Sequence, residues 1–205
     1  MDIVFVVIMA ALWGSFANVC IYRLPKEQGV VSGRSHCPKC KKKIVWYDNI
    51  PIISYFLLSG KCRKCKKKIS IQYSLVEFIS IFSFFNIYYL YGITLTTLLL
   101  MILSLSLIII FFIDLKHFII PNVLTFSMMA LGFAKSFDPN LNPMFPNYIN
   151  SLIGGIFGYG IIWSIIYFYK QIRKKEGMGL GDAKLFAVIG FWFGWISIPF
   201  IIFLS

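Results

Sequence analysis

Long apolar runs alternate with short polar segments along most of the chain. A helix needs roughly 20 apolar residues to cross the ~30 Å hydrocarbon core of a membrane. Runs of about that length fall at residues 3–22, 73–91, 95–113, 118–135, 149–169 and 184–205. Because lipid offers no partner to an unpaired backbone amide, each run is expected to be helical. The pattern predicts an all-α polytopic membrane protein with about six transmembrane helices.

The polar segments divide the chain into three predicted regions. Residues 1–22 form a first transmembrane helix, residues 23–72 a polar loop with four cysteines, and residues 73–205 a transmembrane core. The first apolar run does not read as a cleavable signal peptide, because Asp2 stands where a basic residue is expected and no small-residue cleavage site follows.

Composition supports a membrane environment. The chain has 205 residues, of which 59% are hydrophobic and 14% charged, and its mean hydropathy is +0.78. Soluble domains have about 45–50% apolar and about 25% charged residues. This excess of apolar side chains is too large for the core of a soluble domain of this size, which excludes that class.

The basic residues are distributed unevenly along the chain. The net charge is +12, and nineteen of the twenty Lys and Arg residues lie in 23–68, at Lys116 or in 170–184. The intervening loops near residues 92 and 137–148 hold none, and Lys135 is the exception beside them. The positive-inside rule places the basic loops in the cytoplasm and the N-terminus outside. Topology thus explains the charge, and no nucleic-acid partner is expected.

Four of the five cysteines form two CxxC pairs, Cys37 with Cys40 and Cys62 with Cys65, separated by 21 residues. Four thiolates at this spacing suit tetrahedral zinc with Zn–S bonds of ~2.3 Å. An iron site or free thiols are the alternatives, and a disulfide is not expected in a reducing compartment. Cys20 is expected to be a buried apolar side chain, and His36, beside Cys37, a bystander.

Four sulfur ligands leave no open position for a hydrolytic water, so the zinc is predicted to be structural. It would fold a small cytoplasmic loop, similar to a zinc ribbon, that has little core of its own. The lysines around the cysteines are interpreted as a solvated face that fixes the topology, with contacts to anionic lipid headgroups or an acidic partner as the alternatives.

Two aspartates stand at the borders of predicted spans, Asp114 at the end of the third and Asp182 at the start of the sixth. An ionisable residue at a membrane border is by default a candidate for function. Two carboxyl groups within hydrogen-bond range share one proton, which allows one to activate water while the other protonates the substrate. The sequence therefore suggests an aspartic peptidase with these residues as its catalytic pair.

Structural roles for the two aspartates remain open. Asp114 and Asp182 each precede a lysine by two residues, Lys116 and Lys184, but side chains at that spacing do not face each other on a helix. Asp182 would also suit the N-terminus of a helix. Glycines at 177, 179 and 181 let the backbone bend sharply, and Gly179 and Gly181 are predicted to lie next to the substrate.

Several motifs together resemble bacterial prepilin leader peptidases. The resemblance rests on five segments that occur in the same order over nearly the whole chain. They are Gly14 to Pro25, the double CxxC around Asp48-Asn49-Ile50-Pro51, Tyr73 to Glu77, the segment around Asp114, and the GxGD signature that ends at Asp182.

The resemblance implies cleavage of type IV prepilins and pseudopilins at the cytoplasmic face of the inner (plasma) membrane. It also implies methylation of the new N-terminus with S-adenosylmethionine. By residue matching, Asp114 and Asp182 are catalytic, and the four paired cysteines bind the metal. The resemblance further implies eight spans, two of them after Ser205. No glycine-rich Rossmann fingerprint is present to mark the methyl-donor site.

Other functions also fit parts of the pattern. A non-enzymatic scaffold could use the zinc loop to dock a cytoplasmic partner of a secretion or pilus machine. A transporter could use intramembrane carboxylates as proton relays, but both aspartates are predicted at one face. Glu77 is interpreted as structural, paired with a Lys or Arg, and Asn18 as a hydrogen bond between helices.

Overall fold

The computed structural model describes residues 2–30, 37, 39–141, 145–174 and 179–204. The described residues are largely helical, as the sequence predicts. An isolated antiparallel β-bridge joins Lys61 and Lys68 in the cysteine loop. The chain forms two compact units, residues 1–117 and 118–205, which are described separately.

Among the described residues, four helices are long and apolar enough to cross a membrane. They are α1 (Asp2–Arg23), α3 (Gln72–Tyr91), α4 (Leu95–His117) and α6 (Tyr148–Arg173). At a rise of 1.5 Å per residue, even the shortest of them extends about 30 Å. These helices confirm the predicted spans at 3–22, 73–91, 95–113 and 149–169, so the chain is a multi-pass membrane protein.

The expected span at 118–135 is a shorter helix in the structure. Helix α5 covers Asn122–Ala134, 13 residues, and the 3-10 turn η3 (Lys135–Phe137) follows it. Pro121 precedes the helix in an extended conformation. Proline lacks an N–H and disfavours helical backbone in the residue before it, so a continuous helix through residues 118–121 is not favoured. A helix of this length rises only about 20 Å.

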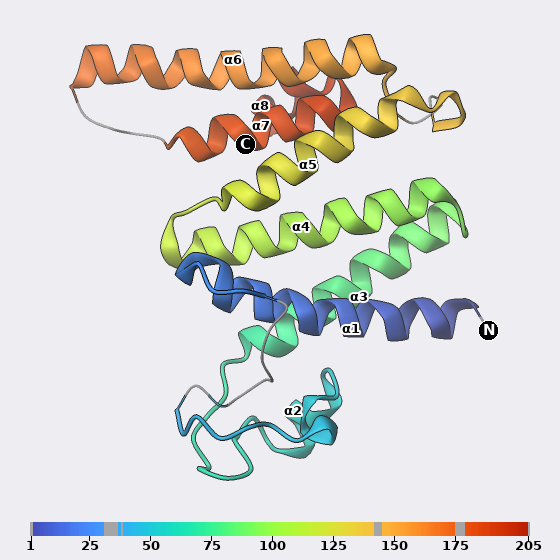
Figure 1. The fold of residues 1–205 in the computed structure, drawn as a ribbon, viewed down its shortest axis with the longest axis vertical. Coiled ribbons are helices and arrows are strands. Elements are labelled where there is room, and N and C mark those ends of the chain that lie inside the picture. Colours follow the sequence, from blue (N-terminus) through green and yellow to red (C-terminus); the bar gives the residue numbers. More distant parts are fainter. Residues whose placement is uncertain (1, 31–36, 38, 142–144, 175–178, 205) are drawn as a thin grey trace. The chain divides into compact units, whose positions relative to one another are not determined.

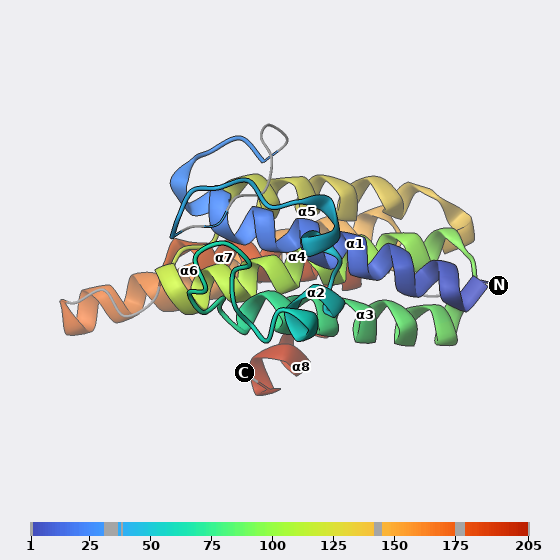
Figure 2. The same ribbon diagram turned by 90° about the horizontal axis from the view of Figure 1, so that it is seen from below.

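The expected span at 184–205 is two helices. Helix α7 covers Leu180–Phe193 and α8 covers Ser197–Leu204. Gly194 separates them with a φ of 79°, which favours glycine, and Figure 2 shows α8 turning away from the line of α7. The predicted count of six spans is therefore not confirmed.

In the first unit, α1 packs against α3 and α4 (Figure 1). Gly14 allows the close approach to α3, because a Cβ atom there would lie 2.9 Å from Glu77 Cα. Asn18 Nδ2 donates a hydrogen bond to the carbonyl oxygen of Tyr73 on α3 at 2.9 Å. This contact confirms the predicted hydrogen bond between helices. Cys20 is buried, as expected.

In the second unit, α6 and α7 lie side by side through glycine contacts (Figure 1). A Cβ atom on Gly154 would overlap the carbonyl oxygen of Gly190, and one on Gly190 would overlap that of Gly154. Ser151 Oγ donates to the carbonyl oxygen of Phe191 at 2.7 Å. Small residues let two helix backbones meet directly, which is a common way of packing helices in membranes.

Gly154→Ala is expected to destabilise the second unit by about 1–3 kcal/mol, because the new methyl group overlaps the backbone of α7. Gly160→Ala on the same helix is the matched control, since a Cβ atom there meets nothing within 4 Å. Unfolding of the purified protein in mixed detergent micelles measures both effects. Equal unfolding midpoints for the two variants would contradict the packing described.

Lys135 is buried although it carries a charge, with only 5% of its surface exposed. Its Nζ donates to the carbonyl oxygen of Trp192 at 3.0 Å. The same ammonium group lies 3.9 Å from the centre of the Phe145 ring. A carbonyl oxygen and an aromatic face both stabilise a cation, so the charge is compensated inside the protein.

Candidate metal centre and peptidase site

The cysteine loop brings its two CxxC pairs together. The Sγ atoms of Cys37, Cys40, Cys62 and Cys65 all lie within 4.8 Å of one another, and those of Cys37 and Cys65 are 3.9 Å apart. Tetrahedral zinc with bonds of about 2.3 Å needs sulfur atoms about 3.8 Å apart. The arrangement therefore fits a zinc ion, as the spacing predicts. His36 lies outside the described residues.

The two CxxC pairs lie in two backbone turns that have the same hydrogen-bond pattern. Cys37 N donates to Lys42 O at 3.0 Å, and Lys41 N donates to Cys37 O at 2.8 Å. The second turn repeats both bonds, Cys62 N to Lys67 O at 3.0 Å and Lys66 N to Cys62 O at 2.9 Å. Lys41 and Lys66 both have a φ of 56°. Each half of the candidate metal site is thus built by its own local hydrogen bonds.

The matching turns reflect an internal repeat that the sequence analysis missed. Residues 37–44 read CPKCKKKI and residues 62–69 read CRKCKKKI, so the two segments differ at one position. Comparing the chain with itself at a separation of 25 residues reveals the repeat. The lysine run after each pair is therefore part of a repeated turn that carries the candidate metal ligands, as well as a source of positive charge.

The thiols differ in how readily they lose a proton. Hydrogen bonds from the backbone of Cys65 and Lys64 lower the pKa of Cys62 to about 7. A backbone hydrogen bond from Lys67 also lowers the pKa of Cys65, but burial and the three neighbouring thiols outweigh it and raise that pKa to about 11. Because a metal binds thiolates, metal loading releases protons and strengthens as the pH rises.

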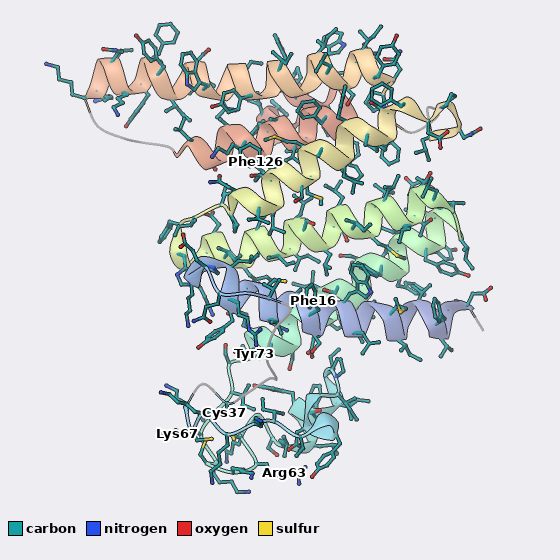
Figure 3. The ribbon with its side chains drawn as sticks, viewed as in Figure 1. Phe16, Cys37, Arg63, Lys67, Tyr73 and Phe126 are labelled. Carbon is teal, nitrogen blue, oxygen red and sulfur yellow. The ribbon has the colours of Figure 1, made fainter. Side chains whose placement is uncertain are left out.

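An ion pair supports the second turn. Arg63 Nη2 lies 2.7 Å from Asp48 Oδ1, and Arg63 Nε donates to Asp48 Oδ2 at 2.8 Å. Asp48 belongs to the 3-10 turn η2 (Trp46–Asn49), and its side chain is 9% exposed. Two parallel hydrogen bonds of this kind fix the geometry of both side chains. Figure 3 shows Arg63 on the loop that also carries Cys37.

Glu77 connects the loop to the helices. Its Oε2 accepts a hydrogen bond from the backbone N–H of Ile52 at 2.7 Å. Ile52 has a φ of 61°, which is unfavourable for a β-branched residue, and it precedes the short helix α2 (Ile53–Leu57). The carboxylate thus holds a strained backbone position, where the sequence suggested a Lys or Arg partner.

Asp114 lies near the C-terminal end of α4 in the first unit, and its side chain is exposed. It is followed by Lys116 and His117 in the last turn of the helix. The structure therefore places this carboxylate at a helix end, as the sequence predicts.

Asp182 lies in the first turn of α7 in the second unit and is half-buried. Its N–H donates to the carbonyl oxygen of Gly179, the residue that precedes the helix, at 3.2 Å. A carboxylate in the first turn is favoured by the exposed N–H groups of that turn. Because the two aspartates belong to different units, their convergence stays a prediction.

The glycines of the GxGD segment differ in their surroundings. A Cβ atom on Gly181 would lie 3.0 Å from Ile120 Cβ, so a side chain there would displace Ile120 by a few tenths of an ångström. A Cβ atom on Gly179 would meet nothing closer than 3.8 Å. Gly177 and Met178 lie outside the described residues. The proposed role of Gly179 and Gly181 next to the substrate stays a prediction.

Asn122 is a residue of this region that the sequence analysis did not single out. Its Oδ1 accepts a hydrogen bond from Lys184 Nζ at 2.7 Å. Lys184 follows Asp182 by two residues on α7, and Asn122 opens α5. The contact joins the ends of two helices beside Asp182. No short motif marks it, because 62 residues separate its members.

Two family models match the chain in sequence. The model of the bacterial peptidase A24 N-terminal domain matches residues 8–91, and the model of the type IV leader peptidase family matches residues 101–205. No solved structure matches the chain significantly.

Curated relatives match over almost the full chain. One from Vibrio cholerae is 37% identical over 97% of this chain and 80% of its own length. Others from Pseudomonas aeruginosa and Neisseria gonorrhoeae are 32% and 35% identical over 97% of the chain, covering 75% and 76% of their lengths. All three are named prepilin leader peptidase/N-methyltransferase. The chain therefore belongs to the type IV leader peptidase family and is an enzyme.

Proposed function

We propose that this protein is an inner-membrane peptidase that removes the leader from type IV prepilins and pseudopilins and then methylates the new N-terminus. The observation that carries the proposal is the match to relatives of that name over 97% of the chain. The matched region includes the segments of both aspartates and all four paired cysteines.

Peptide hydrolysis is proposed to use Asp114 and Asp182 as a pair that holds one proton. The ionised carboxylate accepts a proton from water, and the water oxygen bonds to the scissile carbonyl carbon. The protonated carboxyl group donates to the carbonyl oxygen. As the C–N bond breaks, its electron pair goes to nitrogen, which receives a proton and leaves as the amine. The position of each aspartate at a helix end supports this role.

Cleavage is proposed at the cytoplasmic face. The support is the concentration of basic residues in 23–68, at Lys116 and in 170–184, which the positive-inside rule assigns to the cytoplasm. A substrate with a short basic leader followed by an apolar helix would lie with that helix in the bilayer. Its leader junction would then reach the level of Asp114 and Asp182.

The metal is proposed to be a structural zinc ion held by Cys37, Cys40, Cys62 and Cys65. Four thiolates complete a tetrahedral site and leave no position for a reactive water. The loop around the cysteines has short elements, η2 and α2, and little core of its own, so metal binding supplies much of its folding free energy.

S-adenosylmethionine, when bound, supplies a methyl group on a positively charged sulfur. That methyl group would go to the substrate amine, which would lose a proton to water. The chain's own contribution is to hold the donor and the amine together, away from competing water.

A single assay tests both activities. Purified protein in detergent is incubated with a prepilin, with and without S-adenosylmethionine, and the mass of the product is measured by mass spectrometry. We expect loss of the leader in both samples and an added methyl group only with the donor. An intact prepilin in both samples would contradict the proposed peptidase, and a cleaved but unmodified product would contradict the methylation alone.

A further inference from the structure

The short helix α2, which belongs to the cysteine loop (Figure 1), carries an exposed apolar face. Ile53, Phe56 and Leu57 are 57%, 74% and 79% exposed. Residues three and four positions apart lie on the same side of a helix, so these three side chains form one surface, the α2 face. Phe56 and Leu57 are more exposed than any other large apolar side chain that the structure describes between residues 24 and 70. Grouped exposed apolar side chains mark a site of interaction.

The opposite side of α2 is held against the loop. Ser54 is buried, and its hydroxyl donates to the carbonyl oxygens of Ile50 and Tyr47. After the helix, Gly60 N donates to the carbonyl oxygen of Tyr55 at 2.8 Å. Gly60 has a φ of 64°, which favours glycine. The α2 face cannot turn inward without breaking these hydrogen bonds, so its exposure is a property of the folded loop.

The start of α2 is tied to α3 close to the end of that helix. Glu77 Oε2 accepts the hydrogen bond from Ile52 N, the residue before α2, at 2.7 Å. Glu77 follows Gln72, the first residue of α3, by about 7.5 Å along the helix axis. Helix α3 has 20 residues, just enough to cross a hydrocarbon core of ~30 Å. Its first two turns therefore lie where headgroups meet acyl chains, and α2 begins beside them.

Two lysines lie directly after α2. Lys61 and Lys68 face each other in the antiparallel bridge, and both are exposed. Lys61 N donates to the carbonyl oxygen of Leu58, the residue that follows α2, at 3.0 Å. Like charges directly opposite each other destabilise a strand pair, and anionic groups beside them would offset that cost. An apolar face next to a group of cations is typical of segments that lie in a membrane interface.

We propose that α2 is an interfacial anchor, whose apolar face enters the boundary between headgroups and acyl chains beside the start of α3. Lys61 and Lys68 contact anionic headgroups there. The cysteine loop is then held at two points, by Glu77 and by the α2 face. It lies along the membrane surface instead of projecting into the cytoplasm. The inference goes beyond the proposed function, because it requires only that α3 crosses the membrane.

A bilayer fits the α2 face better than a protein partner does. A helix of five residues is only about 7.5 Å long, whereas a stable protein interface buries roughly 1,200–2,000 Å². A bilayer needs no matching pocket, so a small apolar patch gains from insertion. Since α1 and α3 already hold both ends of the loop at the membrane, insertion costs little further freedom of movement.

Photolabelling from the lipid phase tests the inference. The protein is placed in nanodiscs that contain a phospholipid with a photoreactive group near the top of one acyl chain. After irradiation, trypsin releases α2 on a single peptide, residues 44–61, and mass spectrometry locates the label. We expect label on residues 53–57. The exposed Phe78 and Phe82 of α3 serve as the internal standard for label that reaches the acyl chains.

The double variant Phe56→Ser with Leu57→Ser removes most of the α2 face. Label on residues 53–57, relative to α3, is expected to fall about tenfold or more, because two exposed apolar side chains no longer favour insertion. Val45→Ser is the matched control, since Val45 is a 37% exposed apolar residue of the same loop that precedes η2. The control is expected to be labelled as the unmodified protein is.

Each outcome decides the inference. Label on residues 53–57 that the double variant loses and the control keeps supports it. Label on α3 with none on residues 53–57 overturns it and leaves a protein as the occupant of the α2 face. Equal label in the double variant also overturns it, because the apolar side chains then do not hold α2 in the leaflet.

A second measurement on the unmodified protein applies if the double variant does not fold. The photolabelling is repeated in 1 M salt, where the screening length falls to about 3 Å. Burial of apolar side chains is not screened, so the label on residues 53–57 is expected to stay. Loss of that label at high salt, with the label on α3 retained, would show that the lysines alone hold the loop to the membrane and would overturn the anchor.

Discussion

Asp114→Asn and Asp182→Asn are each expected to slow leader cleavage by about 10²–10⁴-fold, the usual contribution of a general acid or base. Asparagine has nearly the shape of aspartate but cannot take up or release the proton that hydrolysis moves. Each aspartate lies at a helix end, near the C-terminus of α4 or in the first turn of α7, so the exchange should leave the packed helix surfaces unchanged.

The measurement is the rate of prepilin cleavage in membranes with equal amounts of each variant. Asp138→Asn is the control, because the Asp138 side chain accepts hydrogen bonds from the side chain and backbone of Asn140 and belongs to neither helix end. The Asp138→Asn variant is expected to cleave the prepilin at the rate of the unmodified protein. Normal cleavage by either Asp114→Asn or Asp182→Asn would refute the aspartic mechanism.

Cys62→Ser is expected to abolish stable zinc binding and to unfold the loop between α1 and α3. Structural zinc sites contribute about 10–16 kcal/mol at neutral pH, far more than the ion pair of Arg63 with Asp48 can supply. The measurements are zinc content per chain after dialysis against a chelator, and limited proteolysis at the lysines of residues 39–68. We expect one zinc ion in the unmodified protein and rapid cleavage of the variant's loop.

Cys20→Ala is the matched control, since Cys20 is buried in α1 and is not part of the cysteine cluster. It should keep its zinc and its resistance to proteolysis. A Cys62→Ser protein with a full zinc content and a protected loop would show that the four sulfurs do not hold the ion. Lowering the pH should also release zinc from the unmodified protein, because protons compete for the thiolates.

Hydropathy predicted the four long helices well because each is a continuous apolar run without an internal break. It did worse at 118–135 and 184–205. There the backbone is interrupted at Pro121 and at Gly194, while the side chains on both sides stay apolar. Average hydropathy measures solvent preference and is insensitive to a change of backbone direction. The turn signal at Pro121 marked a break but not the length of the helix after it.

The candidate metal site was predictable because its ligands are close together in the sequence within each pair. Two CxxC pairs implied a four-sulfur cluster, and the structure brings the four sulfurs together. The partner of Glu77 was not predictable, because the N–H of Ile52 is a backbone group that no residue pattern reveals. The contact of Lys184 with Asn122 depends on tertiary packing across 62 residues, and a single sequence contains no record of such contacts.

The burial of Lys135 has a consequence for the lipids around the protein. It is the one basic residue beside the loops predicted to lie outside, and the second unit encloses its ammonium group between a carbonyl oxygen and an aromatic ring. On the predicted topology, that charge is therefore largely withheld from phosphate groups in the outer leaflet. Anionic phospholipids should accordingly gather around the predicted cytoplasmic rim alone, where each exposed lysine adds roughly 1 kcal/mol of attraction.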